Sequence, residues 1–256
     1  MAVIRTGIMG ILNVTPDSFY DGGRFADIDR AFEHAMQMVS EGADIIDVGG
    51  ESTRPGSKSV SAGEEIDRVC PVIEKITRES AIPVSIDTTK SAVASEAVRC
   101  GARIINDISG LTFDPGIIRV AAENCTGLVV SHIRGVPENM QKNTSYDNLL
   151  QDILDFLKLS SESAVQSGVS RDKIIIDPGI GFGKSLEQNY VILNNIHRLR
   201  EIGFPVLIGL SRKSLIGKLY DSDEDRLPAT IALNAAAVLR GADIVRVHDV
   251  KAHRLA

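Results

Sequence analysis

Residues 29–54 read DRAFEHAMQMVSEGADIIDVGGESTR and contain the pattern that the rest of the chain repeats. The first half has apolar residues at helical spacing, so that Ala35 and Met38 share one face. Gly42 ends this helix, because glycine adopts the backbone conformation of a helix C-cap without steric strain. A short apolar run follows at residues 44–49, and polar residues come directly after it. The stretch therefore predicts a helix, a buried strand and a polar loop, in that order.

The chain contains eight such apolar runs, which end in polar residues and alternate with segments of helical spacing. Strands that are apolar on both faces and alternate with helices predict a parallel sheet covered by helices. Eight such units in a chain of this length predict an α/β fold of the (β/α)8 TIM-barrel type. A doubly wound sheet is the alternative, because periodicity alone does not separate the two. The runs span residues 7–12, 44–49, 83–87, 103–108, 127–132, 173–177, 205–210 and 243–248.

The sequence predicts a single domain over residues 1–256, because it has no linker, low-complexity tract or block of like charges. After the eighth run only DVKAHRLA, residues 249–256, remains. The final helix is therefore expected to be short or truncated. A gap in the outer ring of helices would leave an apolar patch that a second subunit could cover.

Composition argues against several classes of partner. The net charge of −6 and the pI near 5.4 argue against nucleic acid and against an anionic membrane surface. No apolar stretch approaches the ~20 residues of a membrane span, and the N-terminus reads as a strand rather than a signal peptide. The three cysteines, Cys70, Cys100 and Cys125, form no C-x-x-C pair, which is typical of reduced thiols in a cytoplasmic protein.

Charged and amide side chains follow almost every apolar run. In a barrel the C-terminal ends of the strands meet at one mouth, where the chemistry takes place. Each residue alone could be a loop cap or a buried polar group, and Asp87 in particular could cap the next helix. A set spread over eight strands favours a functional site. The set is Asn13; Glu51, Ser52, Thr53 and Arg54; Asp87; Asn106 and Asp107; His132; Asp177; Ser211, Arg212 and Lys213; Arg246, His248 and Asp249.

The residue types in this set indicate the kind of ligand. Acceptors suit a flat heterocycle rich in N–H groups, and cations suit a phosphate or diphosphate. The acceptors are Asp87, Asn106 and Asp177, and the cations are Arg54, Arg246 and His248. Lys213 adds a donor for a carbonyl or a ring nitrogen. Arg246 could instead place its guanidinium plane against the ring.

Residues 177–185 read DPGIGFGKS and resemble a phosphate-binding loop without matching one. The nucleotide pattern needs a glycine where Pro178 stands, and the dinucleotide pattern needs one where Lys184 stands. We interpret the stretch as a strand-end turn whose glycines let a ligand approach the backbone. Sequence patterns of zinc sites and of Ser-His-Asp nucleophiles do not occur, so neither a tightly held zinc nor an acyl-enzyme is expected.

Seven motifs follow one another along nearly the whole chain: GILNVTPDSF (10–19), GGESTRPGS (49–57), SIDTTK (85–90), INDISG (105–110), IIDPGIGFGK (175–184), GLSRKS (209–214) and RVHDV (246–250). Together they resemble the dihydropteroate synthase family. The resemblance implies a TIM-barrel transferase of folate biosynthesis, which condenses (7,8-dihydropterin-6-yl)methyl diphosphate with 4-aminobenzoate and forms 7,8-dihydropteroate and diphosphate. It also implies Mg²⁺ as cofactor and a homodimer that pairs through its later helices.

The resemblance further implies a role for each matching residue. The pterin would be held by Asp87, Asn106, Asp177 and Lys213, with Arg246 flanking the ring. The diphosphate would be held by Arg246, His248 and Arg54. The aminobenzoate pocket would include Phe19, Thr53, Pro55, Phe182 and Ser214. Asn13 would contact Mg²⁺. The catalytic residues would be Asn13, Arg54, Lys213 and His248.

Two loops and one pocket wall carry further expectations. The polar loops after the first and second strands are expected to close over the site and keep water from a reactive cation. Ser131 and Ile133 stand where the family often carries methionines, so one wall of the pocket would be slightly reshaped.

Two other functions would use parts of the same pattern. A methyltetrahydrofolate:corrinoid methyltransferase would share the three acceptors but has no need of a diphosphate site. A non-catalytic pterin-binding module would have no use for leaving-group residues. The motifs ESTRPG and SRKS therefore favour the synthase.

Overall fold

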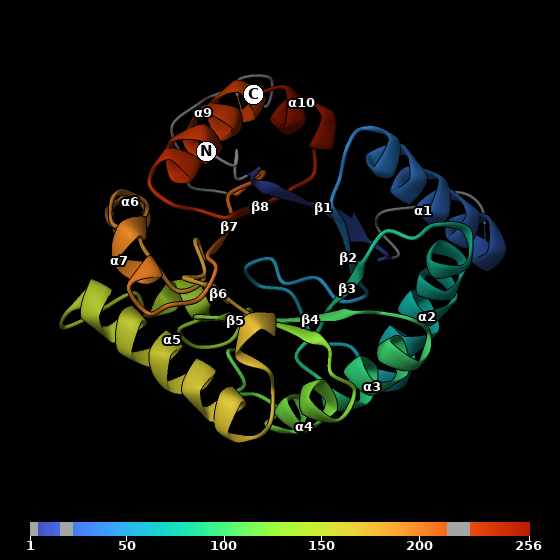
Figure 1. The fold of residues 1–256 in the computed structure, drawn as a ribbon, viewed down its shortest axis with the longest axis horizontal. Helices are drawn as coiled ribbons and strands as arrows, with labels where there is room; N and C mark the ends of the chain where they lie inside the picture. The colour runs from blue at the N-terminus through green and yellow to red at the C-terminus, as the bar shows by residue number, and fades with distance from the viewer. Residues whose placement is uncertain (1–4, 16–22, 214–225) are drawn as a thin grey trace.

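The computed structural model describes residues 5–15, 23–213 and 226–256, without the side chains of residues 23–26. In this part of the chain eight parallel strands form one sheet in the order β6-β5-β4-β3-β2-β1-β8-β7. A bridge between Ile176 and Val206 joins the two ends of that order, so that the sheet closes into a barrel (Figure 1). The strands are β1 (Gly7–Asn13), β2 (Ile45–Gly49), β3 (Val84–Asp87), β4 (Ile104–Asp107), β5 (Gly127–Ser131), β6 (Ile174–Asp177), β7 (Leu207–Gly209) and β8 (Ile244–Val247).

Helices surround the barrel and alternate with its strands (Figure 1). Together with the pairing of β1 and β8, this arrangement confirms the predicted (β/α)8 TIM barrel and excludes the doubly wound alternative. None of the helices in the described part of the chain is long and apolar enough to cross a membrane. The α-helices are α1 (Gly23–Ser40), α2 (Ala62–Glu79), α3 (Ser91–Arg99), α4 (Gly116–Glu123), α5 (Leu149–Gln166), α6 (Leu186–Asn194), α7 (Ile196–Arg200), α9 (Arg226–Leu239) and α10 (Val250–Leu255).

Element boundaries follow the sequence signals closely. Each of the eight predicted apolar runs coincides with one strand to within two residues at either end. Gly42 and Gly241 have φ values of +98° and +110°, which confirms both predicted helix ends. The final helix α10 has six residues and is short, as expected. Its Arg254 donates from Nε to Gly42 O at 3.0 Å and so attaches α10 to the chain just before β2.

Apolar side chains fill the inside of the barrel at its N-terminal half. Met9, Val129 and Leu207, from β1, β5 and β7, are buried together there. Four isoleucines from the even-numbered strands pack against them: Ile45, Ile104, Ile175 and Ile244. A larger core lies between the barrel and the helices. This inner apolar layer forms the floor of the barrel, and the polar residues of the mouth lie above it.

Candidate active site

A polar layer lies directly above the apolar floor of the barrel. Side chains two residues apart on a strand point to the same face. Each of the four floor isoleucines is therefore followed, two positions on, by a residue that also faces inward. The polar layer is Asp47, Asn106, Asp177 and Arg246, one residue from each even-numbered strand, as in the four-residue layers typical of TIM barrels.

Arg246 lies at the centre of this polar layer. Its Nε donates to Asp47 Oδ2 and its Nη2 donates to Asp87 Oδ2, both at 2.6 Å. Asn106 Nδ2 donates to the same oxygen of Asp47 at 3.0 Å. Asp47 is fully buried and was not among the predicted site residues, although a charged residue inside an apolar run is an unusual signal. Two carboxylates thus hold the guanidinium group in one orientation.

Burial and mutual charge shift the pKa values in this group. Burial lowers the pKa of Arg246, but Asp47 and Asp87 raise it by more, so that it lies above its ordinary value. Burial raises the pKa of Asp87 to about 7, with Arg246 opposing the rise and Asp47 adding to it. Asp87 Oδ1 is buried and has no hydrogen-bond partner in the described structure. Asp87 is thus a carboxyl that changes charge near neutral pH and has an acceptor to offer a ligand.

Asp177 and Lys213 interact electrostatically at the mouth, without a direct hydrogen bond between them in the described structure. Burial raises the pKa of Asp177, and Lys213 opposes that rise. Burial lowers the pKa of Lys213 to about 8, with Asp177 opposing the fall. Lys213 Nζ donates to Ile180 O and lies 4.4 Å from the centroid of the Phe182 ring. The carboxylate and the aromatic face both stabilise the ammonium group at this position.

The residues predicted to hold a diphosphate are grouped around His248. Its Nδ1 lies 2.9 Å from Ser211 Oγ. Burial, together with Arg212, Arg246 and Arg54, lowers the pKa of His248 to about 3, with Asp249 opposing the fall. Without a bound anion the imidazole is therefore neutral at pH 7, and its place at the diphosphate stays a prediction. The same excess of positive charge would attract an anionic ligand.

A buried charge network shapes the β2–α2 loop, which carries Thr53 and Arg54. Lys90 Nζ donates to Glu51 Oε2 at 2.7 Å and to Glu65 Oε2 at 2.6 Å. Glu51 Oε2 also accepts a hydrogen bond from a backbone N–H of the loop, at Val60. The loop is therefore tied to α2 and to the start of α3. Glu51 was predicted to lie at the mouth, whereas Glu65 and Lys90 were not singled out, because the three become partners only in the fold.

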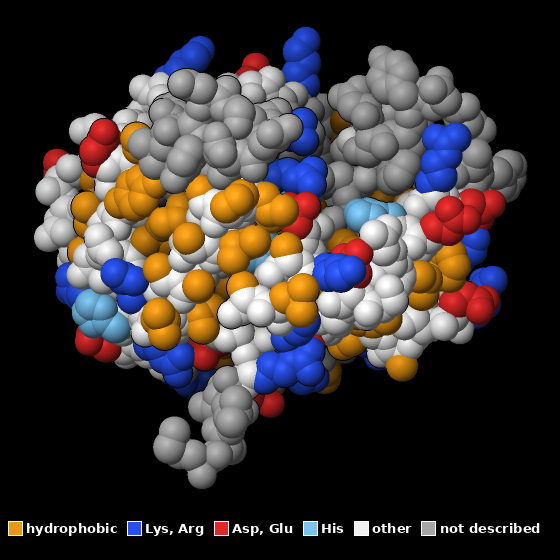
Figure 2. Space-filling view, turned by 90° about the horizontal axis from the view of Figure 1, so that it is seen from above, with side chains coloured by type: hydrophobic (Ala, Val, Ile, Leu, Met, Phe, Trp, Pro, Cys, Tyr) orange, Lys and Arg blue, Asp and Glu red, His pale blue; other side chains and the backbone are white. Residues whose placement is uncertain are grey.

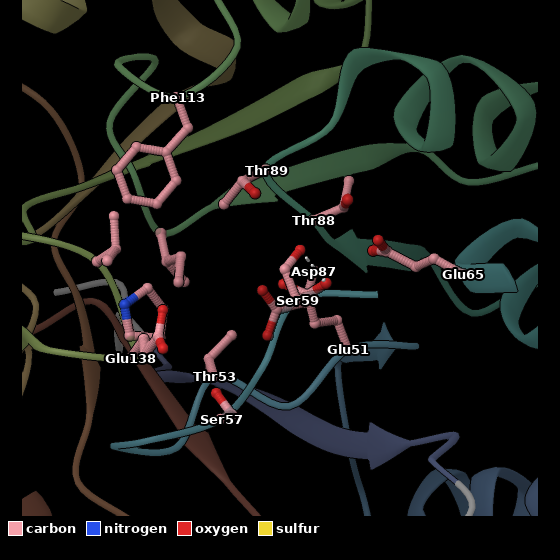
Figure 3. Close-up of a pocket in the computed structure, with 13 residues that line it drawn as sticks. Glu51, Thr53, Ser57, Ser59, Glu65, Asp87, Thr88, Thr89, Phe113 and Glu138 are labelled. Atoms are coloured by element: carbon pink, nitrogen blue, oxygen red, sulfur yellow. Dashed lines mark hydrogen bonds between the residues drawn. The ribbon is translucent and has the colours of Figure 1, made fainter. Parts of the chain in front are cut away.

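The β2–α2 loop touches the β5–α5 loop, where Gly56 N donates to Pro137 O at 3.1 Å. A cavity of about 260 Å³ lies between these loops and the ends of β3 and β4 (Figure 3). The carboxylate of Asp87 and the side chain of Thr53 both face this cavity, and the exposed Phe113 lies opposite them. Its lining is Glu51, Thr53, Ser57, Ser59, Glu65, Asp87, Thr88, Thr89, Ile108, Phe113, Val136, Pro137 and Glu138.

Asn13 ends β1 beside Gly49, the last residue of β2. A Cβ atom added to Gly49 would lie 3.8 Å from Asn13 Oδ1 and 3.6 Å from Asp87 Cβ. The side-chain oxygen of Asn13 is therefore at the mouth, separated from Asp87 by the space that the glycine leaves open.

Most of the predicted site residues meet at this mouth. Pro55 is exposed on the β2–α2 loop, and its place in the aminobenzoate pocket stays a prediction. Phe19 and Ser214 lie outside the described residues, as does part of the loop after β1 that was expected to close over the site. The residues that gather at the mouth are Asn13, Thr53, Arg54, Asp87, Asn106, Asp177, Phe182, Lys213, Arg246 and His248.

His132 was grouped with the mouth residues, and the structure corrects this. Its ring meets Phe156 of α5 edge-on, with 5.0 Å between ring centroids, and its Nδ1 lies 3.0 Å from Lys184 Nζ. Lys184 is buried and also donates to Gly179 O and Phe182 O, both at 2.9 Å. His132 and Lys184 therefore hold the turn after β6 against α5, outside the barrel.

Two glycines of that turn serve the chain's own packing. Gly179 has a φ of +67°, and a Cβ there would lie 1.9 Å from His132 O. A Cβ on Gly183 would lie 2.5 Å from Arg134 O. These two glycines let the turn approach the β5–α5 loop, and the approach of a ligand to the turn stays a prediction.

Asp107 also differs from its predicted place at the mouth. It accepts hydrogen bonds from Ser109 N at 2.8 Å and Leu111 N at 2.7 Å. Successive residues of a strand face opposite sides, so that Asn106 points into the barrel and Asp107 points out of it. Asp107 therefore stabilises the turn after β4.

Known proteins resemble this chain over nearly its whole length. Residues 9–248 match the family described as pterin binding enzyme. A relative from Synechocystis named dihydropteroate synthase is 48% identical over 250 residues, which cover 97% of this chain and 86% of that protein.

Solved structures give the same neighbours. A dihydropteroate synthase from Clostridium difficile, crystallised in the presence of pteroic acid, has a TM-score of 0.93 and 47% identity, with 98% of this chain and 94% of that chain covered. A dihydropteroate synthase from Xanthomonas albilineans, with 4-aminobenzoic acid, has a TM-score of 0.91 and 41% identity, with 98% and 90% covered.

Proposed function

The chain belongs to the pterin-binding enzyme family, and from this premise we propose that it is a dihydropteroate synthase. It transfers the dihydropterin-methyl group of (7,8-dihydropterin-6-yl)methyl diphosphate to the amino group of 4-aminobenzoate, and diphosphate leaves. One observation carries this function most directly. Buried acceptors and buried cations meet at one mouth, where Asp87 contacts Arg246 and Asp177 faces Lys213.

The acceptor side of the mouth fits a pterin. Asp87 Oδ1 is a buried oxygen without a partner in the described structure, and a ring N–H or amino group would satisfy it. Asp177 and Asn106 add acceptors from the same polar layer, and Lys213 adds a donor. Arg246 is held flat between two carboxylates, in a position to lie against the ring.

The cationic side fits the leaving group. When the C–O bond to the diphosphate breaks, the bonding electrons go to the diphosphate oxygen and the pterin-methyl group is left with positive charge. Arg54, Arg246 and His248 would stabilise the charge on the diphosphate, and the carboxylates would stabilise the pterin cation. The arylamine nitrogen then attacks the methyl carbon and loses a proton. Charge stabilisation, rather than a strong nucleophile of the protein, therefore drives the reaction.

The donor set at the mouth fits a magnesium ion. Mg²⁺ keeps several waters and is usually held by one or two protein oxygens together with substrate phosphates. Asn13 Oδ1 is such an oxygen, at the mouth beside Gly49 and near Asp87. No cluster of three His, Cys, Asp or Glu residues that could hold a metal occurs among the described residues. When bound, Mg²⁺ would stabilise the charge on the departing diphosphate.

The aminobenzoate would lie between the pterin and the β2–α2 loop. Thr53, Pro55 and Phe182 are the described residues that we assign to this pocket, together with Phe19 and Ser214, which lie outside the described residues. The bound ligands of the Clostridium and Xanthomonas neighbours support a site that takes a pterin on one side and 4-aminobenzoate on the other.

The free cysteines suit a reducing compartment such as the cytoplasm.

Diphosphate release tests the function when it is measured with and without 4-aminobenzoate. The purified protein should release diphosphate and form 7,8-dihydropteroate with both substrates and Mg²⁺, and EDTA should stop the reaction. Methyl transfer to a corrinoid protein, without condensation, would instead support the methyltransferase alternative. Pterin binding without any turnover would support a non-catalytic module.

The pKa values at the mouth predict a narrow bell-shaped dependence of kcat/KM on pH. Asp87 accepts ring N–H groups best as a carboxylate, so kcat/KM should rise with pH as Asp87 loses its proton near pH 7. Lys213 donates as an ammonium group, so kcat/KM should fall as it loses its proton near pH 8. In Asp87→Asn the acidic limb should disappear and the basic limb should remain. An acidic limb that is unchanged in this variant would contradict the assignment.

We also propose that the protein is a homodimer that pairs through α9. An apolar stripe on α9, made of Pro228, Ala232, Ala235 and Leu239, is exposed at helical spacing. Hydrophobic side chains gather over this helix on the face shown in Figure 2. The opposite face of α9 already packs on the barrel core. A helix that is apolar on two faces needs a partner for the second one.

A charge in this stripe should dissociate the dimer. Leu239 is 88% exposed, so Leu239→Lys should leave the fold intact and raise the dimer Kd by at least about tenfold, since a lysine would be buried at the interface. Sedimentation equilibrium measures this change. Leu159→Lys is the matched control, because Leu159 is 71% exposed on α5. A monomeric unmodified protein, or equal dissociation in both variants, would contradict the interface.

A further inference from the structure

The end of α3 approaches one stripe of α2 closely. Thr77 Oγ1 donates to Cys100 O at 3.2 Å, and Cys100 Sγ lies 3.5 Å from Glu74 Oε1. Gly101 makes this approach possible, because a Cβ there would lie 2.9 Å from Thr77 Oγ1. Cys100 therefore lies directly over the stripe of α2 that contains Glu74 and Thr77.

Cys70 belongs to the same stripe. It precedes Glu74 by four residues, and residues at this spacing are neighbours on a helix surface. The two thiols are close enough to act on each other, since Cys100 lowers the pKa of Cys70 and Cys70 raises the pKa of Cys100. Both thiols are free and half-buried, whereas Cys125 is exposed by itself in the turn before β5. The fold thus brings together two thiols that are widely spaced in the sequence.

We propose that Cys70 and Cys100 are an oxidative modification site, at which a low-molecular-weight disulfide such as glutathione disulfide links α2 to α3. The thiolate of one cysteine attacks the oxidant, displaces one thiol and forms a mixed disulfide. The second cysteine attacks the protein sulfur of that mixed disulfide and displaces the other thiol. The pair loses two protons and two electrons, and the oxidant becomes two thiols.

The surroundings of the pair make this reaction slow at neutral pH. Burial raises the pKa of the Cys70 thiol, and Glu96 and Glu74 add to the rise while Arg99 opposes it. Burial also raises the pKa of Cys100, and Cys70 and Glu74 add to that rise. Because the thiolate is the attacking form, the link should form faster as the pH rises. The two thiols should therefore react slowly at neutral pH and form the link only during prolonged exposure to the oxidant.

The link would strengthen the outer ring without reaching the mouth. Cys100 comes just before β4, at the end of the barrel opposite the site. A disulfide between α2 and α3 closes a loop over residues 70–100 and restricts the unfolded chain. The oxidised protein should therefore unfold at a temperature several degrees higher and keep its activity. The link would join the two helices that support the β2–α2 loop. Glu65 lies on α2, and its partner Lys90 lies at the start of α3.

Mass spectrometry of the full chain tests the link directly. After incubation with glutathione disulfide at pH 8, the intact mass should fall by two hydrogen atoms, and a tryptic digest should contain one linked peptide pair with Cys70 and Cys100. Dithiothreitol should reverse both changes. The thermal unfolding midpoint should rise by several degrees in the oxidised protein.

Three serine variants complete the test. Cys70→Ser and Cys100→Ser should each abolish the link and the rise in unfolding temperature. Cys125→Ser is the matched control and should leave both unchanged. Mixed disulfides on Cys70 or Cys100 that never resolve into a link would overturn the proposal. So would a link that forms only between Cys125 residues of two chains.

Discussion

Asp177→Ala and Lys213→Ala are each expected to lower kcat/KM for dihydropteroate formation by about 30-fold to several thousand-fold. This range corresponds to about 2–5 kcal/mol, the usual cost of removing a buried charged group that binds a ligand and interacts with an opposite charge. Asp177 and Lys213 interact electrostatically at the mouth, and each would bind the pterin on one side. Removing either one weakens the hold on the ring and leaves the other charge buried without its partner.

A surface pair offers a matched control for this experiment. Lys75 Nζ lies 2.5 Å from Asp29 Oδ1 and 4.6 Å from the centroid of the Phe32 ring. It therefore has the same kinds of partner as Lys213, but on the outside of the molecule. Lys75→Ala should keep full activity, with at most about 1 kcal/mol lost in stability. Full activity in folded Asp177→Ala and Lys213→Ala would end the site assignment.

The second large effect concerns stability. Asp47→Ala should lower the free energy of unfolding by about 3–5 kcal/mol, because it leaves the buried Arg246 without one of its two carboxylates. It should also lower activity, since Asp47 fixes the guanidinium group that flanks the ring. Urea unfolding followed by circular dichroism measures the first effect, and kcat/KM measures the second.

An exposed ion pair is the control for Asp47. Arg99 and Glu96 lie 2.7 Å apart with exposed side chains, so Glu96→Gln should change the free energy of unfolding by no more than about 1 kcal/mol. Replacing both members of the buried pair, with Asp47→Ala and Arg246→Met, should recover part of the stability but none of the activity. A urea midpoint in Asp47→Ala equal to that of the unmodified protein would refute the role of this aspartate.

Patterns of neighbouring residues determine the fold of this chain. Runs such as residues 44–49 are apolar on both faces and can be buried only in a sheet covered by helices. Gly42 and Gly241 mark helix ends because the conformation they adopt is strained for other residues. The eight strands, the short last helix and the mouth at the strand ends all follow from such local signals. The family resemblance supplied the identity of the ligands.

The direction of each side chain needed the tertiary structure. Asp47 joins the site because its side chain points into the barrel and meets Arg246, which is 199 positions away in the sequence. His132 and Asp107 leave the site because they turn outward, although both stand at strand ends. The charge of His248 likewise depends first on its burial and then on the three arginines that the fold places near it. Local sequence determines which segments become strands, whereas burial and long-range contacts decide which polar groups meet and what charge they carry.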